Sequence, residues 1–226
     1  MHLNERINNM KVVIGIGVFI LAIGLAGYSH PTHAACVFAD GDELSNSHLE
    51  LIKKASDRIE SKFGSMRSQP IIYFFDLEGG FWQRKLNPYG STIHLGYRTC
   101  VAIGPYGQNI DVVAHELMHA EIEERAGFWT RATKIPDWFE EGLVMQVDLR
   151  ERYNLPVGHP TKYVTELFSR RKFYVSSPDG VLTQNYAAAK AEVGAWLSQA
   201  SAKGVYENLS EIKEGTSFDS IWQNSR

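Results

Sequence analysis

Residues 111–128 read DVVAHELMHAEIEERAGF and have the boundaries of a long helix. Asn109 or Asp111 can cap the first turn, and Gly127 stands where helices commonly end. The apolar residues recur at helical spacing and give the stretch one apolar side. A charged outer face is expected on the other side. It comprises Glu121, Glu123, Glu124 and Arg125.

Two histidines lie four residues apart in this helix, and a glutamate directly follows the first. Residues at this spacing project from the same side, about 6 Å apart along the axis, so His115 and His119 can bind one ion together. Glu116 lies about 100° around the axis, where it can take a proton from a zinc-activated water. The pattern is the HExxH arrangement of zinc hydrolases. The competing interpretation is an amphipathic helix with two buried core histidines.

A catalytic zinc requires a third protein ligand and an open position for water. Metzincins carry a glycine and another histidine after the motif, but Ile122 and Arg125 occupy those positions here. The next candidate is PDWFEEGL at residues 136–143. Taken alone, two glutamates in a first helical turn also suit the helix dipole without any metal.

Trp138, Glu141 and Gly142 resemble the gluzincin pattern, in which a later helix carries a glutamate ligand followed by glycine in a Trp-x-x-Glu-Gly context. Carried over by this match, Glu141 is the third zinc ligand and Glu140 is not. In some gluzincins a carboxylate four residues after the ligand orients a histidine, and Met145 occupies that position here. That support must therefore come from elsewhere, with Asp148 or a backbone carbonyl as candidates.

The resemblance covers roughly residues 71–222 and implies a small sheet over the HExxH helix. An edge strand of this sheet, either STIHLGY at 91–97 or CVAIGP at 100–105, would pair with an extended peptide substrate. Gluzincins often stabilise the oxyanion with a tyrosine or histidine of the helical part. Tyr186 is the first choice, because it starts a helix expected to face the site. The other candidates are Tyr163, Tyr174 and His159.

The chain as a whole predicts an α+β, zincin-like fold, with a small N-terminal sheet followed by an all-helical part. Helix signals lie at 45–64, 137–153, 161–173 and 184–204, with a short last helix from Val205. Strand signals lie at 70–77, 92–97 and 100–105, and a turn is expected at 130–138.

The first 34 residues predict a secretory signal peptide. Arg6 and Lys11 precede an uncharged apolar run at 12–28, and Thr32 and Ala34 suit cleavage after Ala34. An uncleaved membrane anchor is the alternative, since 17 residues reach the lower limit for a spanning helix. Either version predicts an exported protein, periplasmic or extracellular, with a single domain at 35–226.

Cys36 and Cys100 are the two cysteines of the chain. An oxidising compartment favours a disulfide between them. Lipid attachment at Cys36 and two unpaired thiols are the alternatives.

The composition of the chain favours some classes of function and disfavours others. The chain has 226 residues, a net charge of −3 and 44% hydrophobic residues, which suits a globular domain and gives no basic field for nucleic acid. Contact with a membrane is expected only through residues 12–28. The expected function is an exported metallopeptidase that binds one zinc ion and cleaves a peptide or protein with Glu116 as general base. The alternatives are a zinc-stabilised, catalytically silent binding domain and a metal-free helical scaffold. The sequence predicts no oligomeric state.

Overall fold

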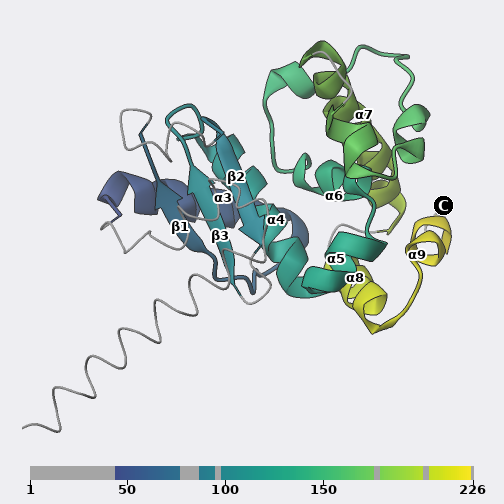
Figure 1. Cartoon of the computed structure of the whole chain (residues 1–226), viewed down its shortest axis with the longest axis horizontal. Coiled ribbons are helices and arrows are strands. Elements are labelled where there is room, and N and C mark those ends of the chain that lie inside the picture. Colours follow the sequence, from purple (N-terminus) through teal and green to yellow (C-terminus); the bar gives the residue numbers. More distant parts are fainter. Residues whose placement is uncertain (1–43, 77–86, 95–97, 176–178, 201–203, 225–226) are drawn as a thin grey trace, which may run out of the picture.

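The computed structural model describes residues 44–76, 87–94, 98–175, 179–200 and 204–224 (Figure 1). The predicted α+β class is confirmed, since one three-stranded sheet is combined with a larger number of helices. In the part of the chain described, no helix is long and apolar enough to cross a membrane. The predicted leader at 1–34 lies outside the described residues.

The first described helix, α3 (Asn46–Phe63), has the predicted boundaries. The Ser45 side chain accepts a hydrogen bond from the backbone N–H of His48, and Gly64 ends the helix with a φ of 97°. Its buried residues contribute to the same core as the sheet and the HExxH helix. Helix α3 therefore covers one side of that helix.

The sheet has the strand order β1-β3-β2. The strands are β1 (Ile71–Phe74), β2 (Gly90–His94) and β3 (Thr99–Ile103). Strand β3 is parallel to β1 and antiparallel to β2. Of the two sequence candidates for a substrate-binding edge, β3 is excluded because it is central, while β2 lies at an edge.

Helix α4 (Ile110–Ala126) carries the HExxH motif and begins after Asn109, whose side chain accepts from the backbone N–H of Val112. The predicted charged outer face is wrong for three of its four residues, because Glu121, Glu123 and Arg125 are buried. Elements pack against several sides of this helix: α3, the sheet, α6 and α8 all contact it. Figure 1 shows α4 between the sheet and the C-terminal helices.

The buried charge on α4 is compensated by partners far away in the sequence. Glu121 is fully buried and accepts hydrogen bonds from the backbone N–H groups of Arg67 and Ser68, at 2.9 and 2.8 Å. The Nε of Arg125 donates to the same carboxylate at 2.6 Å. A buried carboxylate with three donors is stable in an interior where an unpaired one would not be.

The turn predicted at 130–138 is wrong in its first half, where the structure has helix α5 (Phe128–Lys134). Gly127 adopts a φ of 78°, which ends α4 and lets the next helix begin at once. Its carbonyl accepts from the backbone N–H of Arg131 at 2.9 Å. Pro136 then directly precedes α6 (Asp137–Val144), a position that suits its restricted backbone.

The helix predicted at 137–153 is also shorter than expected. Helix α6 stops at Val144, and a separate short 3-10 turn, η2 (Glu151–Tyr153), follows. Between them the Asp148 carboxylate accepts from the backbone N–H and the guanidinium of Arg150, which holds the chain in a bend. Local hydrogen bonding of this kind competes with a helix.

The C-terminal part is helical but less regular than predicted. The helix expected at 161–173 is wrong: the structure has a 3-10 turn, η3 (Lys162–Glu166), and a π-helical turn, η4 (Arg171–Val175). Helix α7 (Asp179–Ala200) begins earlier than the predicted residue 184, so Tyr186 lies inside this helix and not at its start. The chain described ends with α8 (Val205–Glu214) and α9 (Phe218–Asn224).

Helices α6 and α7 pack at very short range because of Gly142. A Cβ at this position would lie 2.4 Å from Val193 Cγ2 and 2.6 Å from the Ala189 carbonyl oxygen, both on α7. Only glycine fits such an approach. The glycine that follows Glu141 in the sequence therefore sets how α6 is placed.

Candidate metal centre

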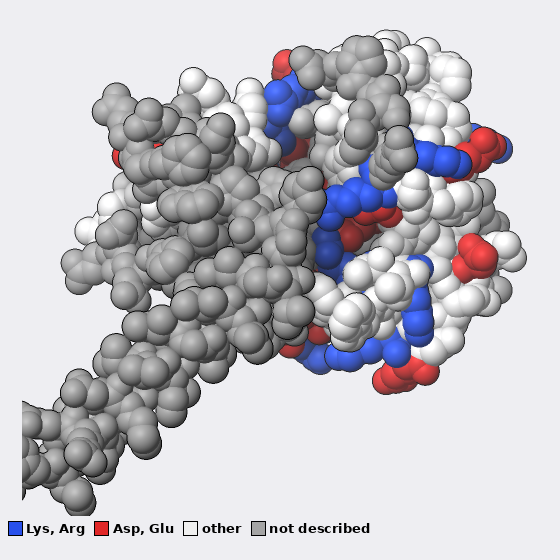
Figure 2. All heavy atoms as spheres, in the orientation of Figure 1, with Lys and Arg blue, Asp and Glu red and all other residues white. Residues whose placement is uncertain are grey.

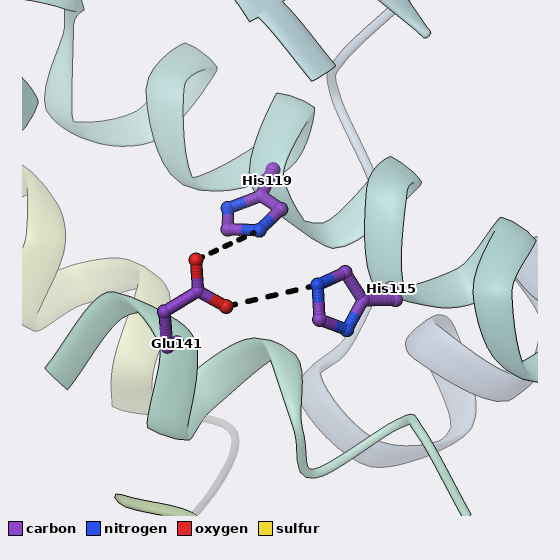
Figure 3. Close-up of side chains that lie close together, drawn as sticks. All are labelled: His115, His119 and Glu141. Atoms are coloured by element: carbon purple, nitrogen blue, oxygen red, sulfur yellow. Dashed lines mark ion pairs between the residues drawn. The ribbon is translucent and has the colours of Figure 1, made fainter. Parts of the chain in front are cut away.

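Three buried side chains from two helices converge next to the sheet. His115 and His119 project from α4, and Glu141 projects from α6 (Figure 3). One ligand atom from each lies within 4.8 Å of the others. His115 Nε2 is 3.7 Å from Glu141 Oε2, and His119 Nε2 is 3.5 Å from Glu141 Oε1. Both imidazoles thus present the same nitrogen to one carboxylate.

The separations fit a metal ion better than direct hydrogen bonds. A nitrogen–oxygen distance of 3.5 or 3.7 Å is too long for a good hydrogen bond. Tetrahedral zinc with ligands at about 2.0–2.2 Å spaces its ligand atoms by roughly 3.3–3.6 Å. Glu141 Oε2 is buried and has no hydrogen-bond partner among the described residues. A cation between the three side chains would satisfy this oxygen, so the residues present fit a zinc ion.

The other nitrogen of each imidazole faces a second carboxylate. His119 Nδ1 lies 2.7 Å from Glu140 Oε1. His115 Nδ1 lies 3.4 Å from Asp148 Oδ2, a contact without hydrogen-bond alignment. A carboxylate at Nδ1 favours a proton there and leaves the Nε2 lone pair free for a metal. Asp148, a sequence candidate for this support, lies at His115, whereas the position of Glu140 at His119 was not predicted.

Both supporting carboxylates are themselves held by arginines. Arg131 on α5 donates to Glu140 Oε1 from Nε at 2.9 Å and lies within 2.8 Å through Nη2. Arg150 donates from Nε to Asp148 Oδ1 at 2.9 Å. Burial opposes ionisation of Glu140, but Arg131 and His119 outweigh it and lower the pKa of its carboxyl to about 2.

The electrostatic field of the site attracts positive charge. Burial by itself lowers the pKa of His119. The carboxylates of Glu141, Glu140 and Glu116 act in the opposite direction and raise that pKa to about 9. In the protein without metal the site therefore holds a proton strongly, as a cation-binding site should.

Glu116 is buried beside the histidines, and strand β2 holds it there. Thr92 Oγ1 lies 2.7 Å from Glu116 Oε2 and 2.9 Å from the Glu116 carbonyl oxygen. Two residues earlier on the same face of β2, a Cβ on Gly90 would come within 3.1 Å of Glu116 Oε1. The edge strand thus encloses the carboxylate from one side. The sequence contained no signal for this contact between residues 24 positions apart.

Two tyrosines border the site. The hydroxyl of Tyr174, on η4, donates a hydrogen bond to Glu141 Oε1. The ring of Tyr186 stands edge-on to His115, with 6.3 Å between ring centroids. Burial, followed by the charge of Glu141, raises the pKa of both tyrosines well above its usual value. In the described part of the chain, Tyr163 and His159 form no hydrogen bond or ion pair with these residues.

Comparison with known proteins gives no match, neither to a family model nor to a curated protein or a solved structure. The geometry alone defines the class of site: a buried His–His–Glu group with a glutamate beside it and carboxylates behind both histidines.

Proposed function

We propose that the protein is an exported zinc metallopeptidase of the gluzincin type. The orientation of the two imidazoles carries the proposal. The Nε2 atoms of His115 and His119 face Glu141, while the Nδ1 atoms face Asp148 and Glu140. Metal-binding histidines typically have this second carboxylate. The Glu-Gly pair that resembles the gluzincin pattern supplies the third side chain of the group.

The proposed chemistry needs one zinc ion, held by His115, His119 and Glu141. Zinc at this position would polarise the scissile carbonyl and lower the pKa of the attacking water. Glu116 takes the proton from that water and passes it to the leaving amine. Because Thr92 occupies Oε2 of this carboxylate, Oε1 is the oxygen available for proton transfer.

A hydrogen-bond donor is also needed where negative charge develops on the carbonyl oxygen. Both site tyrosines keep their protons at neutral pH, since their pKa values are raised. Tyr174 already donates to Glu141 and orients that carboxylate. We therefore assign oxyanion stabilisation to Tyr186, whose ring lies against His115.

The substrate is proposed to be an extended peptide that pairs with strand β2. Strand β2 lies at an edge of the sheet, and Thr92 on this strand contacts Glu116. A peptide added along this edge would pass directly beside the general base. In this proposal, the sheet and α4 correspond to the small sheet over the HExxH helix that a zincin-like fold would have.

Export is proposed from the leader at residues 1–34. The predicted disulfide fits an oxidising compartment. Cys100 is buried on β3 and is disulfide-bonded, whereas Cys36 lies outside the described residues, so the pairing remains a prediction.

Three proteins test the proposal: the native form, Glu116→Gln and His119→Ala, each purified after export. We expect about one zinc per chain in the native and Glu116→Gln proteins and little in His119→Ala. A peptide library should be cleaved by the native protein alone. Zinc binding without any cleavage would support the silent binding domain instead, and a native protein without zinc would support the scaffold.

A further inference from the structure

Arg152 is a cation near the candidate site that has no carboxylate partner among the described residues. The two other arginines near the site do have carboxylate partners: Arg131 is paired with Glu140 and Arg150 with Asp148. Arg152 is exposed and lies on η2, the short turn after the bend at Asp148. Its guanidinium contacts two aromatic rings. A guanidinium with no carboxylate partner among the described residues can accept a carboxylate from a ligand.

Two tyrosines from opposite parts of the fold hold this guanidinium. Its Cζ lies 4.7 Å from the ring centroid of Tyr153, on the same turn, and 5.3 Å from that of Tyr89. Tyr89 directly precedes strand β2, and its carbonyl accepts from the backbone N–H of Gly104 at 3.0 Å. Two cation–π contacts reduce the conformational freedom of the arginine before any ligand binds.

Both tyrosines are connected to the candidate site through neighbouring residues. Tyr153 packs against Tyr186 with 5.7 Å between ring centroids, and Tyr186 packs against His115 at 6.3 Å. On the other side, Tyr89 is followed by Gly90, the residue that encloses Glu116. Arg152 thus joins the sheet to the helical part at the end of β2 where Gly90 lies. A peptide paired with β2 would reach it within a few residues, at about 3.3 Å per residue.

On the face shown in Figure 2, Lys and Arg side chains lie among Asp and Glu side chains and form no broad basic field. A preference for a negative group must therefore come from a particular cation and not from the general surface. The guanidinium of Arg152 offers the planar pair of donors that matches a carboxylate.

We propose that Arg152 binds a carboxylate of the peptide substrate and so determines which peptides are cleaved. This inference rests on the proposed peptidase function. The carboxylate has two sources, an Asp or Glu side chain at a fixed distance from the scissile bond or the C-terminal carboxylate of a short peptide. Tyr89 and Tyr153 position the arginine and also offer rings against which the neighbouring part of the peptide can pack.

The test compares matched peptides that differ by one charge. One series replaces Gln by Glu at each position on either side of the cleaved bond, and a second replaces a C-terminal amide by the free acid. For the native protein we expect a roughly 10- to 100-fold higher kcat/KM for the charged peptide at one position or at the C-terminus. In Arg152→Gln the ratio of kcat/KM between the charged and the neutral peptide should fall to about one.

Two further variants make the outcome specific. Arg98→Gln removes an exposed arginine next to the opposite end of β2, where Thr99 pairs with His94, and should keep the preference. Arg152→Glu should invert it in favour of Lys at the same position. Equal cleavage of charged and neutral peptides by the native protein, or a preference that persists in Arg152→Gln, would overturn the inference.

A binding measurement separates this inference from the proposed function. Peptide affinity is measured on the zinc-loaded Glu116→Gln protein, with and without Arg152→Gln added. A carboxylate-dependent affinity that needs Arg152 supports the inference even if the native protein cleaves no peptide, a result that would reject the peptidase function alone. Native cleavage of neutral and charged peptides alike supports the function and rejects the inference.

Discussion

Thr92 on the edge strand β2 lies 2.7 Å from Oε2 of Glu116 on the HExxH helix, through its Oγ1 atom. The strand proposed to bind the peptide is therefore in direct contact with the proposed general base. The proposed peptide pairing and the proposed proton transfer would thus be linked through one hydroxyl group. Any displacement of β2 would also displace this carboxylate.

Thr92→Val should lower kcat by roughly tenfold or more, because a hydrogen bond to a charged group contributes about 1.5–3 kcal/mol. Zinc content should stay the same, since Thr92 contacts none of the three proposed ligands. Thr92→Ser keeps the hydroxyl and should recover most of the activity. Steady-state kinetics together with metal analysis test this, and an equal loss of zinc in Thr92→Val would contradict the positioning role.

Glu140→Gln should weaken zinc binding by roughly 10- to 100-fold, as loss of a carboxylate behind a metal-binding histidine typically does. Glu141→Gln should have a larger effect, because it removes a proposed ligand. Glu124→Gln is the matched control, since Glu124 is the exposed glutamate on α4. Competition with a chelator gives the three zinc affinities. The proposed division of roles fails if Glu140→Gln loses more affinity than Glu141→Gln.

The main part of the site could be predicted because it depends on local geometry. Four-residue spacing on a well-capped helix places His115 and His119 side by side regardless of the remaining fold. Local geometry alone does not assign the separate roles of Glu140 and Glu141. Neighbours on a helix point about 100° apart, so one can face Nε2 atoms while the other reaches an Nδ1, and only the structure shows both.

Contacts between distant segments were not predictable from periodicity. Glu121 looks like a surface residue in the sequence, because its partners at Arg67 and Ser68 are over 50 positions away. Helix α5 was missed since a positive φ at Gly127 allows one helix to follow another without a loop. The contact between Arg131 on this helix and Glu140 therefore could not be predicted from the sequence.

In the metal-free protein, His94 at the end of β2 should make a destabilising contribution as the solution becomes acidic. Burial lowers the pKa of His94, with the neighbouring Glu123 only partly opposing this. Below pH 6.5 the unfolded chain therefore binds a proton that the folded protein resists, which favours unfolding. Glu123, whose folded pKa is lowered from 4.5, adds a further loss at still lower pH.

His94→Gln isolates the histidine contribution, because glutamine can still donate to Glu123 but does not titrate. The free energy of unfolding is measured by urea denaturation at pH 7.5, 6.5 and 5.5. From pH 7.5 to 5.5, the change in the free energy of unfolding should be less favourable to the folded state in the native protein than in His94→Gln. Parallel curves for the two proteins would show that His94 titrates at its ordinary pKa in the folded state.

Tyr186→Phe should lower kcat by roughly 100-fold or more if its hydroxyl stabilises the oxyanion, with zinc content unchanged. Tyr174→Phe should instead weaken zinc binding, because its hydroxyl donates to Glu141. Tyr163→Phe on η3 is the control and should resemble the native protein. Kinetics and zinc affinity of the three variants assign the roles; a kcat loss confined to Tyr174→Phe would transfer oxyanion stabilisation to Tyr174.

Gly142→Ala should disturb the candidate metal centre through the packing of α6 on α7, without changing any polar group. The added Cβ would lie 2.4 Å from Val193 Cγ2 and 2.6 Å from a backbone oxygen of α7, so α6 and α7 must move apart. We expect about 1–3 kcal/mol less unfolding free energy and weaker zinc binding, because Glu141 moves with α6.

Gly194→Ala is the matched control on the facing helix. A Cβ there would meet Gln146 at 3.5 Å or more, an ordinary contact, and alanine favours the interior of a helix by up to about 1 kcal/mol over glycine. Thermal unfolding should therefore show a lower Tm for Gly142→Ala and an equal or higher one for Gly194→Ala. If Gly142→Ala retained native stability and zinc affinity, the spacing of α6 and α7 would not control Glu141.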